Sequence, residues 1–297
     1  MKFTVFSILL IFAAEATQAQ ELEPRAYANL PKDLNAIALL YGVSRGNVIA
    51  DPSLPIADFK VTAQTLGLGY VRTFAFAKRL ARVQLLTPFT DLTGKLKLNG
   101  VDTSGARVGF GDARLRLGIN ILGSPALSAK EFRTYQQKTL LGVSLITSIP
   151  TGLYFRDKRI NLGSNRWGFK PEVGISRRFK RIYAEAYTGI WFFTNNKEFL
   201  TNKVLTQEPV FSIQGHLSYY FKNQIWIGIN ANWFTGGQTK IDEAPSGNLE
   251  NNWRIGATLS VPINPKNSLK LQFHVGAFTS KGYDYNFVAL SYQYVFF

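Results

Sequence analysis

The chain has 297 residues, a formal net charge of +15 and no cysteine, so it forms no disulfide and offers no thiolate to a metal. Aromatic residues make up 14% of it, and beyond the N-terminus no stretch approaches the roughly 18 apolar residues of a membrane-spanning helix. A basic balance of this size is compatible with nucleic-acid binding, but the N-terminus argues against that class.

The N-terminus has the pattern of a secretory signal peptide, which we expect at residues 1–19. A basic start at Lys2 precedes an apolar run over residues 5–14, and small residues lead up to a cleavage site after Ala19. A run of this length is too short to span a membrane, so a cleaved signal is favoured over an N-terminal anchor. The mature protein therefore leaves the cytoplasm, and we expect no nucleic-acid partner.

The next stretch, residues 20–34, contains Pro24 and Pro31 and shows no regular alternation. We interpret it as a periplasmic lead-in that is either irregular or tucked into a barrel. Residues 35–297 then form one domain.

A stretch centred on residues 112–121 alternates without a break between polar and aliphatic side chains. The polar set is Asp112, Arg114, Arg116, Gly118 and Asn120, and the aliphatic set is Ala113, Leu115, Leu117, Ile119 and Ile121. A period of two predicts a β-strand with a different solvent on each face. The aliphatic face could be the core of a soluble sandwich or the lipid face of an outer-membrane barrel.

Similar alternation predicts about twelve strands along the chain. Their expected ranges are 35–44, 61–75, 80–89, 109–123, 138–150, 167–179, 182–194, 209–221, 225–234, 252–263, 269–280 and a last strand ending at Phe297. We expect long loops at 46–58, 90–105, 151–166, 195–208 and 235–251. Ser128 and Glu131 form a capping-box pattern, which predicts a short helix through about Gln137.

Two regularities favour the membrane barrel over the sandwich. Long polar connections alternate with short turns, as the extracellular loops and periplasmic turns of outer-membrane barrels do, with the helical connection as the exception. The chain also ends in an apolar, aromatic strand over residues 288–297, which is typical of chains delivered to the outer-membrane insertion machinery. The predicted fold is all-β, a transmembrane antiparallel β-barrel of about 12 strands with a short helix in one periplasmic connection. We expect it in the bacterial outer membrane, in contact with lipids and lipopolysaccharide, with both termini periplasmic.

Several stretches resemble a family of bacterial outer-membrane transporters labelled as components of a meta-cleavage pathway of phenol degradation. They are Gly-Phe-Gly-Asp at 109–112, Ile-Asn-Leu-Gly-Ser-Asn-Arg-Trp-Gly-Phe-Lys-Pro-Glu at 160–172, Trp-Phe-Phe-Thr at 191–194 and Gln-Gly-His-Leu-Ser-Tyr at 214–219. The resemblance extends over nearly all of the mature chain. It implies a β-barrel with a channel or transport role, and the family label implies aromatic substrates while leaving their identity open.

Candidate lumen-lining residues lie on the polar face of the predicted strands. They are Arg82, Asp112, Arg114, Arg116, Asn120, Lys170, Glu172, Glu185, His216, Arg254, Lys270 and His274. An unpaired charge inside a narrow barrel is costly, so we expect the carboxylates to pair with basic side chains and brace the wall.

An enzymatic alternative is a lipase-like barrel that uses His216 with Ser218 or Ser144. A serine hydrolase needs a base and an orienting group within hydrogen-bond reach of the serine, and the chain has no Gly-x-Ser-x-Gly stretch. We therefore interpret His216 and His274 as members of a lumen hydrogen-bond network and predict no catalytic residue. With two histidines and no cysteine, and with only a partial glycine motif at 109–111, we expect no metal and no cofactor.

The function predicted from these observations is passive uptake of a small solute. Surplus arginine and lysine would favour an anion, and Tyr187, Trp191 and Trp226 could offer flat faces to an aromatic one. A structural barrel that is closed to solutes remains the third alternative, because small barrels are filled by side chains.

Overall fold

The computed structural model describes residues 22–49, 56–98, 100–158 and 161–297. The predicted signal peptide at 1–19 lies outside the described residues. Among the helices of the described chain, none is both long enough and apolar enough to cross a membrane.

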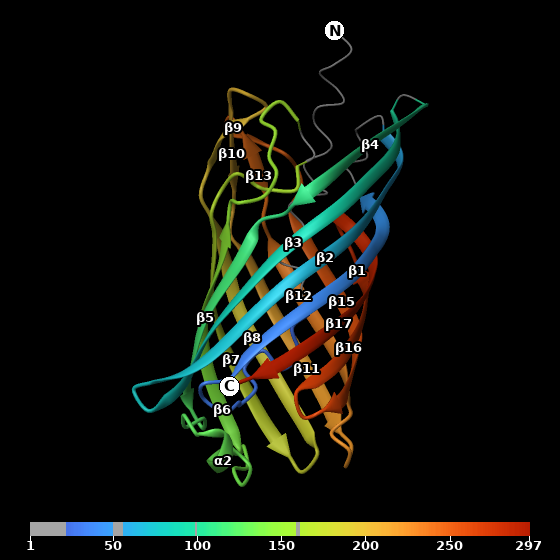
Figure 1. Cartoon of the computed structure of the whole chain (residues 1–297). Coiled ribbons are helices and arrows are strands. Elements are labelled where there is room, and N and C mark those ends of the chain that lie inside the picture. The colour runs from blue at the N-terminus through green and yellow to red at the C-terminus, as the bar shows by residue number, and fades with distance from the viewer. Residues whose placement is uncertain (1–21, 50–55, 99, 159–160) are drawn as a thin grey trace.

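The described chain forms a closed antiparallel barrel of 12 strands in which each strand pairs with the next along the chain (Figure 1). The strands are β1 (Asn35–Ile49), β2 (Ile56–Phe76), β3 (Arg79–Leu98), β5 (Ala113–Leu122), β6 (Thr139–Ile149), β7 (Gly168–Phe179), β8 (Ile182–Phe193), β11 (Val210–Tyr220), β12 (Trp226–Gly236), β15 (Glu250–Asn264), β16 (Asn267–Phe278) and β17 (Gly282–Phe296). The barrel closes where β1 pairs with β17, with Asn35 opposite Phe296. β4 (Val101–Phe110) continues β5 upward and pairs with the upper part of β3.

The two faces of the wall have opposite polarity. On β7 the side chains alternate strictly, with Lys170 and Glu172 buried at 4% and 3% exposure and Val173 exposed at 45%. On β5 the outward Leu117 is 50% exposed while the inward Arg116 is buried. Aliphatic side chains outside and charged side chains inside are the reverse of a soluble sandwich. The distribution is that of a barrel surrounded by lipid, which confirms the predicted fold class.

The two ends of the barrel differ in their connections. At one end the strands are joined mostly by short turns, such as Ala77 and Lys78 between β2 and β3, both with positive φ. At the other end the long connections build a separate four-stranded sheet of β9 (Asn196–Phe199), β10 (Lys203–Gln207), β13 (Thr239–Ile241) and β14 (Ala244–Pro245). The sequence predicted plain loops there, at 195–208 and 235–251. Phe199 and Leu205 form the buried core that orders this small sheet.

The prediction of a long loop at 90–105 was wrong. β3 continues to Leu98, and β4 begins at Val101, so these residues form a hairpin. Leu92 and Leu96 point inward and are buried, while Lys95 points outward and is exposed. On the outer face of β3 the side chains are apolar at Leu85 and Phe89, in the region here called the apolar belt, and charged at Asp91 and Lys95 above it.

The predicted helix is shorter than expected. α2 (Ala129–Phe132) ends well before Gln137, although the capping box between Ser128 and Glu131 is present as predicted.

Candidate functional site

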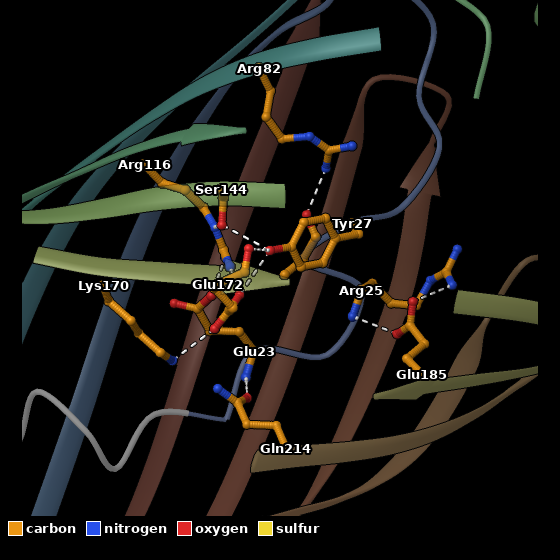
Figure 2. Close-up of polar contacts among 11 residues, drawn as sticks. Glu23, Arg25, Tyr27, Arg82, Arg116, Ser144, Lys170, Glu172, Glu185 and Gln214 are labelled. Atoms are coloured by element: carbon orange, nitrogen blue, oxygen red, sulfur yellow. Dashed lines mark hydrogen bonds and ion pairs between the residues drawn. The ribbon is translucent and has the colours of Figure 1, made fainter. Parts of the chain in front are cut away.

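Residues 22–34, here called the N-terminal segment, lie inside the barrel before the chain enters β1. Leu22, Tyr27 and Leu34 are buried at 3%, 2% and 7% exposure. Side chains from β3, β5, β6, β7, β8 and β11 contact the segment from several sides (Figure 2). These contacts correspond to the tucked-in alternative for this stretch.

The ring of Tyr27 rests on two glycines that face each other across β6 and β7. Gly142 and Gly174 are register partners, and a Cβ on either would come within 2.3 Å of a Tyr27 ring atom. The ring of Tyr187 packs edge-on against Tyr27, with centroids 5.1 Å apart. The Tyr27 hydroxyl lies 2.9 Å from Ser144 Oγ. The missing side chains of the glycines therefore create the space that this tyrosine occupies.

A group of charged side chains surrounds the Tyr27 hydroxyl and is here called the Glu172 cluster: the buried Arg116, Lys170 and Glu172, and the half-buried Glu23. Arg116 donates hydrogen bonds to Glu23 and to Glu172, and Lys170 Nζ lies 2.7 Å from Glu172 Oε2. The Tyr27 hydroxyl donates to Glu172 Oε1 at 3.2 Å. The cluster alternates in sign and its charges balance, which satisfies the requirement that charges in a low-dielectric interior be paired.

A second ion pair joins the N-terminal segment to β8. Arg25 donates to Glu185 through its backbone N–H at 2.9 Å and through its guanidinium at 3.0 Å. The guanidinium carbon lies 3.8 Å above the ring centre of Tyr183, a cation–π contact. The segment is thus bound at two points by charge as well as by the Tyr27 ring.

Arg82 of β3 binds the segment through backbone carbonyl groups. It is 3% exposed and donates to the carbonyl oxygens of Ala26 and Ala28, each at 2.7 Å. Carbonyl dipoles solvate the guanidinium but do not cancel its charge, so Arg82 contributes positive potential to the interior.

Nearer the end with the long connections, the inner face becomes apolar. Phe59, Val61, Leu92, Leu96, Tyr283 and Tyr285 form a buried cluster there. Arg254 lies beside this cluster, with its guanidinium 3.7 Å from the ring centre of Tyr285 and a 2.8 Å hydrogen bond to the Tyr285 carbonyl. The interior therefore presents an arginine directly beside aromatic rings.

The two histidines lie on the inner face in separate surroundings. His216 Nδ1 is 2.8 Å from Asn230 Oδ1, and Asn230 donates to Thr258 at 3.1 Å. His274 packs against the ring of Phe287. Ser144 bonds to Tyr27 and to Arg116, so its described partners do not include a histidine.

Most of the predicted lumen residues are buried on the inner face. The buried ones are Arg82, Arg116, Asn120, Lys170, Glu172, Glu185, His216, Arg254 and His274, while Asp112, Arg114 and Lys270 are half-buried. Sequence reasoning missed Glu23, Arg25 and Tyr27, which bind the inner face from the N-terminal segment. The only signal for them was the polar and aromatic character of a short stretch with no alternation.

Asp112 accepts hydrogen bonds from backbone and hydroxyl groups, whereas we expected it to pair with an arginine. It lies at the break between β4 and β5 and accepts hydrogen bonds from the backbone N–H groups of Gly152 and Ser164 at 2.9 and 2.8 Å. The Ser164 hydroxyl donates to the same carboxylate at 2.6 Å. Its described role is to hold the connection between β6 and β7 against the barrel.

Comparison with known proteins gives a family and a fold. The family model described as "Putative MetA-pathway of phenol degradation" matches residues 42–290. No curated protein matches the chain.

Among solved structures, an outer membrane channel of Pseudomonas putida F1 is 20% identical, with a TM-score of 0.80 over 93% of this chain and 100% of that one. The transport unit of the autotransporter AIDA-I from Escherichia coli is 12% identical, with a TM-score of 0.55 over 95% of each chain. The β-domain of the Bordetella autotransporter BrkA is also 12% identical, with a TM-score of 0.51 over 89% of this chain and 100% of that one. At these identities the likeness concerns the fold, which is that of outer-membrane β-barrels.

Proposed function

The chain belongs to the family described as "Putative MetA-pathway of phenol degradation", and from this premise we propose that it is an outer-membrane channel for passive uptake of small anionic or aromatic solutes. The observation that carries the proposal is the charge of the barrel interior. Its basic side chains are Arg25, Arg82, Arg114, Arg116, Lys170, Arg254 and Lys270, and its acidic side chains are Glu23, Asp112, Glu172, Glu185 and Glu250. The basic side chains outnumber the acidic ones, and narrow low-dielectric walls concentrate the resulting positive potential.

Aromatic side chains on the same face support the second half of the proposal. Tyr187, Trp191 and Trp226 are buried at 1%, 2% and 7% exposure on inward positions of β8 and β12. Flat rings beside guanidinium groups suit a solute that combines an aromatic ring with a negative charge. The fold likeness to the outer membrane channel of Pseudomonas putida F1 is consistent with a channel.

Transport in this proposal is diffusive. Among the described residues, the barrel interior holds the short N-terminal segment and no folded plug domain. Hydrogen bonds and ion pairs attach this segment to the wall. Lipids of the outer membrane surround the barrel, and the solute enters from the extracellular end.

The competing proposal is a barrel closed to solutes. The observation that favours it is the path of the N-terminal segment, which crosses the interior at the level of the Glu172 cluster. Single-channel recording in planar bilayers separates the two proposals. A conducting barrel supports the channel, whereas a barrel that conducts no ions supports closure.

Reversal potentials across a salt gradient then test the charge argument. We expect anion selectivity in the unaltered protein and a smaller anion preference in Arg82→Gln, because that change removes a charge that, among the described residues, is bound by carbonyl oxygens rather than by a carboxylate. Lys222→Gln is the matched control, since Lys222 is exposed in the short turn between β11 and β12. A cation-selective barrel would end the anion proposal.

The lipase-like alternative has a direct test as well. In the described structure His216 bonds to Asn230. Hydrolysis of a phospholipid or ester that is lost in His216→Ala would support an enzyme, and hydrolysis that persists would trace to a contaminant.

A further inference from the structure

The outer face of β1, β2 and β3 carries basic side chains above the apolar belt. Along β3 the outward positions run from Leu85 and Phe89, which are 38% and 39% exposed, to the exposed Lys95 and Lys97. On β2 they run from Leu66 to Lys60, and on β1 from Tyr41 to Arg45, and all four of these side chains are exposed. Figure 1 shows β2, β3 and β4 rising together beyond the upper part of the wall. We call Arg45, Lys60 and Lys95 the basic face.

Strand register places these charges next to one another. Lys60 is the direct register partner of Lys95, and Arg45 lies opposite Thr62, two residues further along β2. Like charges directly opposite each other on a sheet destabilise the pairing. Among the described residues, none of the three basic-face side chains forms an ion pair. An anion from outside the chain that contacts these side chains would offset their mutual repulsion.

The height of the basic face identifies where that anion comes from. Leu66 pairs with Phe89, and Lys60 and Lys95 lie six residues further along their strands. At about 3.3 Å per residue and a tilt of about 40°, six residues raise a side chain by roughly 15 Å above the level of Leu66 and Phe89. The phosphorylated sugars of lipopolysaccharide occupy this layer, directly above the acyl chains of the outer leaflet.

We propose that the basic face binds the phosphate groups of lipopolysaccharide and so attaches the β1–β3 side of the barrel to the outer leaflet. Clusters of lysine and arginine at a membrane surface bind phosphorylated lipid head groups. Arg45 can bind a phosphate oxygen pair through its planar guanidinium, and Lys60 and Lys95 act as point charges from adjacent strands. The inference goes beyond the proposed channel function and does not depend on it.

The test measures binding of purified lipopolysaccharide to the detergent-solubilised full-length protein at low salt with a divalent-ion chelator. The variant Arg45→Gln/Lys60→Gln/Lys95→Gln is compared with Arg181→Gln/Lys222→Gln/Lys266→Gln. The control residues are exposed at the short-turn end, so both variants lose the same charge. We expect the basic-face variant to bind about a hundredfold more weakly and the control to bind like the unaltered protein.

Two further ligands fix the source of the phosphate. Lipopolysaccharide treated to remove its phosphates should bind the unaltered protein as weakly as intact lipopolysaccharide binds the basic-face variant. The single phosphate of phosphatidylglycerol lies at the boundary of the acyl chains, well below the basic face, so phosphatidylglycerol micelles should bind equally to both variants. Unchanged affinity in the basic-face variant, full affinity for dephosphorylated lipopolysaccharide, or a phosphatidylglycerol affinity that falls with the basic face would each overturn the proposal.

Discussion

Replacing Gly174 with alanine should release the N-terminal segment from the barrel interior. The added Cβ would lie 2.3 and 2.4 Å from two ring atoms of Tyr27 and 2.8 Å from a ring atom of Tyr187. Carbon atoms in contact are about 3.5–4.0 Å apart, so the Tyr27 ring must move by more than about 1 Å. Such a movement breaks the hydrogen bonds of its hydroxyl to Ser144 and Glu172.

The magnitude follows from the cost of overpacking a buried site. That cost is about 1–3 kcal/mol, which raises the population of the released segment by about 5- to 150-fold. The chain has no cysteine, so Ala28→Cys places a single thiol on the segment. The rate of its reaction with a membrane-impermeant maleimide reports the released population, because the half-buried docked position reacts slowly.

Gly215→Ala is the matched control. Gly215 lies on β11 and a Cβ there would meet no atom within 4 Å, so the same chemical change adds no clash. Equal labelling rates in the Gly174→Ala and Gly215→Ala variants would refute the conclusion that Tyr27 packed against Gly174 holds the segment in place. In a Tyr27→Ala background, Gly174→Ala should add little to the labelling rate, because the ring that it displaces is gone.

Other expectations concern the faces, ends and connections of the barrel. Leu117→Arg, on the lipid face, should lower the free energy of unfolding in liposomes by about 2–4 kcal/mol, and an unchanged value would contradict the lipid assignment. Asp112→Ala should lower the melting temperature in detergent at a cost of about 2 kcal/mol, since the carboxylate holds the β6–β7 connection, and it should speed proteolysis of that connection. A cysteine at Lys203 in β10 should be labelled from outside intact cells, and labelling only after permeabilisation would reverse the orientation. Hydrogen bonds from Ser128 lower the pKa of Glu131 from its ordinary 4.5. The α2 cap should therefore be intact above pH 4.5 and be lost as the pH falls through the lowered pKa. Faster amide exchange in α2 would report this loss.

The alternation of side chains was sufficient to predict the barrel because lipid and interior impose opposite demands on adjacent residues. Where the outer solvent changes from lipid to water, the same reasoning failed. On the upper part of β3, Leu92 and Leu96 face inward and Asp91 and Lys95 face outward. Apolar residues inside and polar residues outside are the pattern of a soluble sheet, which is opposite to the pattern of residues 112–121. A search for strands with an apolar outer face therefore assigns this stretch to a polar loop.

The contacts of the N-terminal segment could not be predicted from alternation. Gly142 and Gly174 fit the inward parity of their strands, but their role depends on being register partners and on Tyr27 arriving from elsewhere in the chain. The alternation along each strand identified which charged side chains face inward. It did not identify the residues with which those side chains pair. Arg116 on β5 binds both Glu172 on β7 and Glu23 of the N-terminal segment. These pairings require the closed geometry of the barrel.

The position of the N-terminal segment has a consequence for the order of assembly. Glu23 binds Gln214, which is 191 residues away along the chain, and Arg25 binds Glu185, which is 160 residues away. The surface that holds the segment does not exist until β3 and β5–β8 have paired with one another and with β11. Residues at the N-terminal end of the described chain must therefore wait for strands that lie much later in the sequence, and they dock only onto a wall that has already formed.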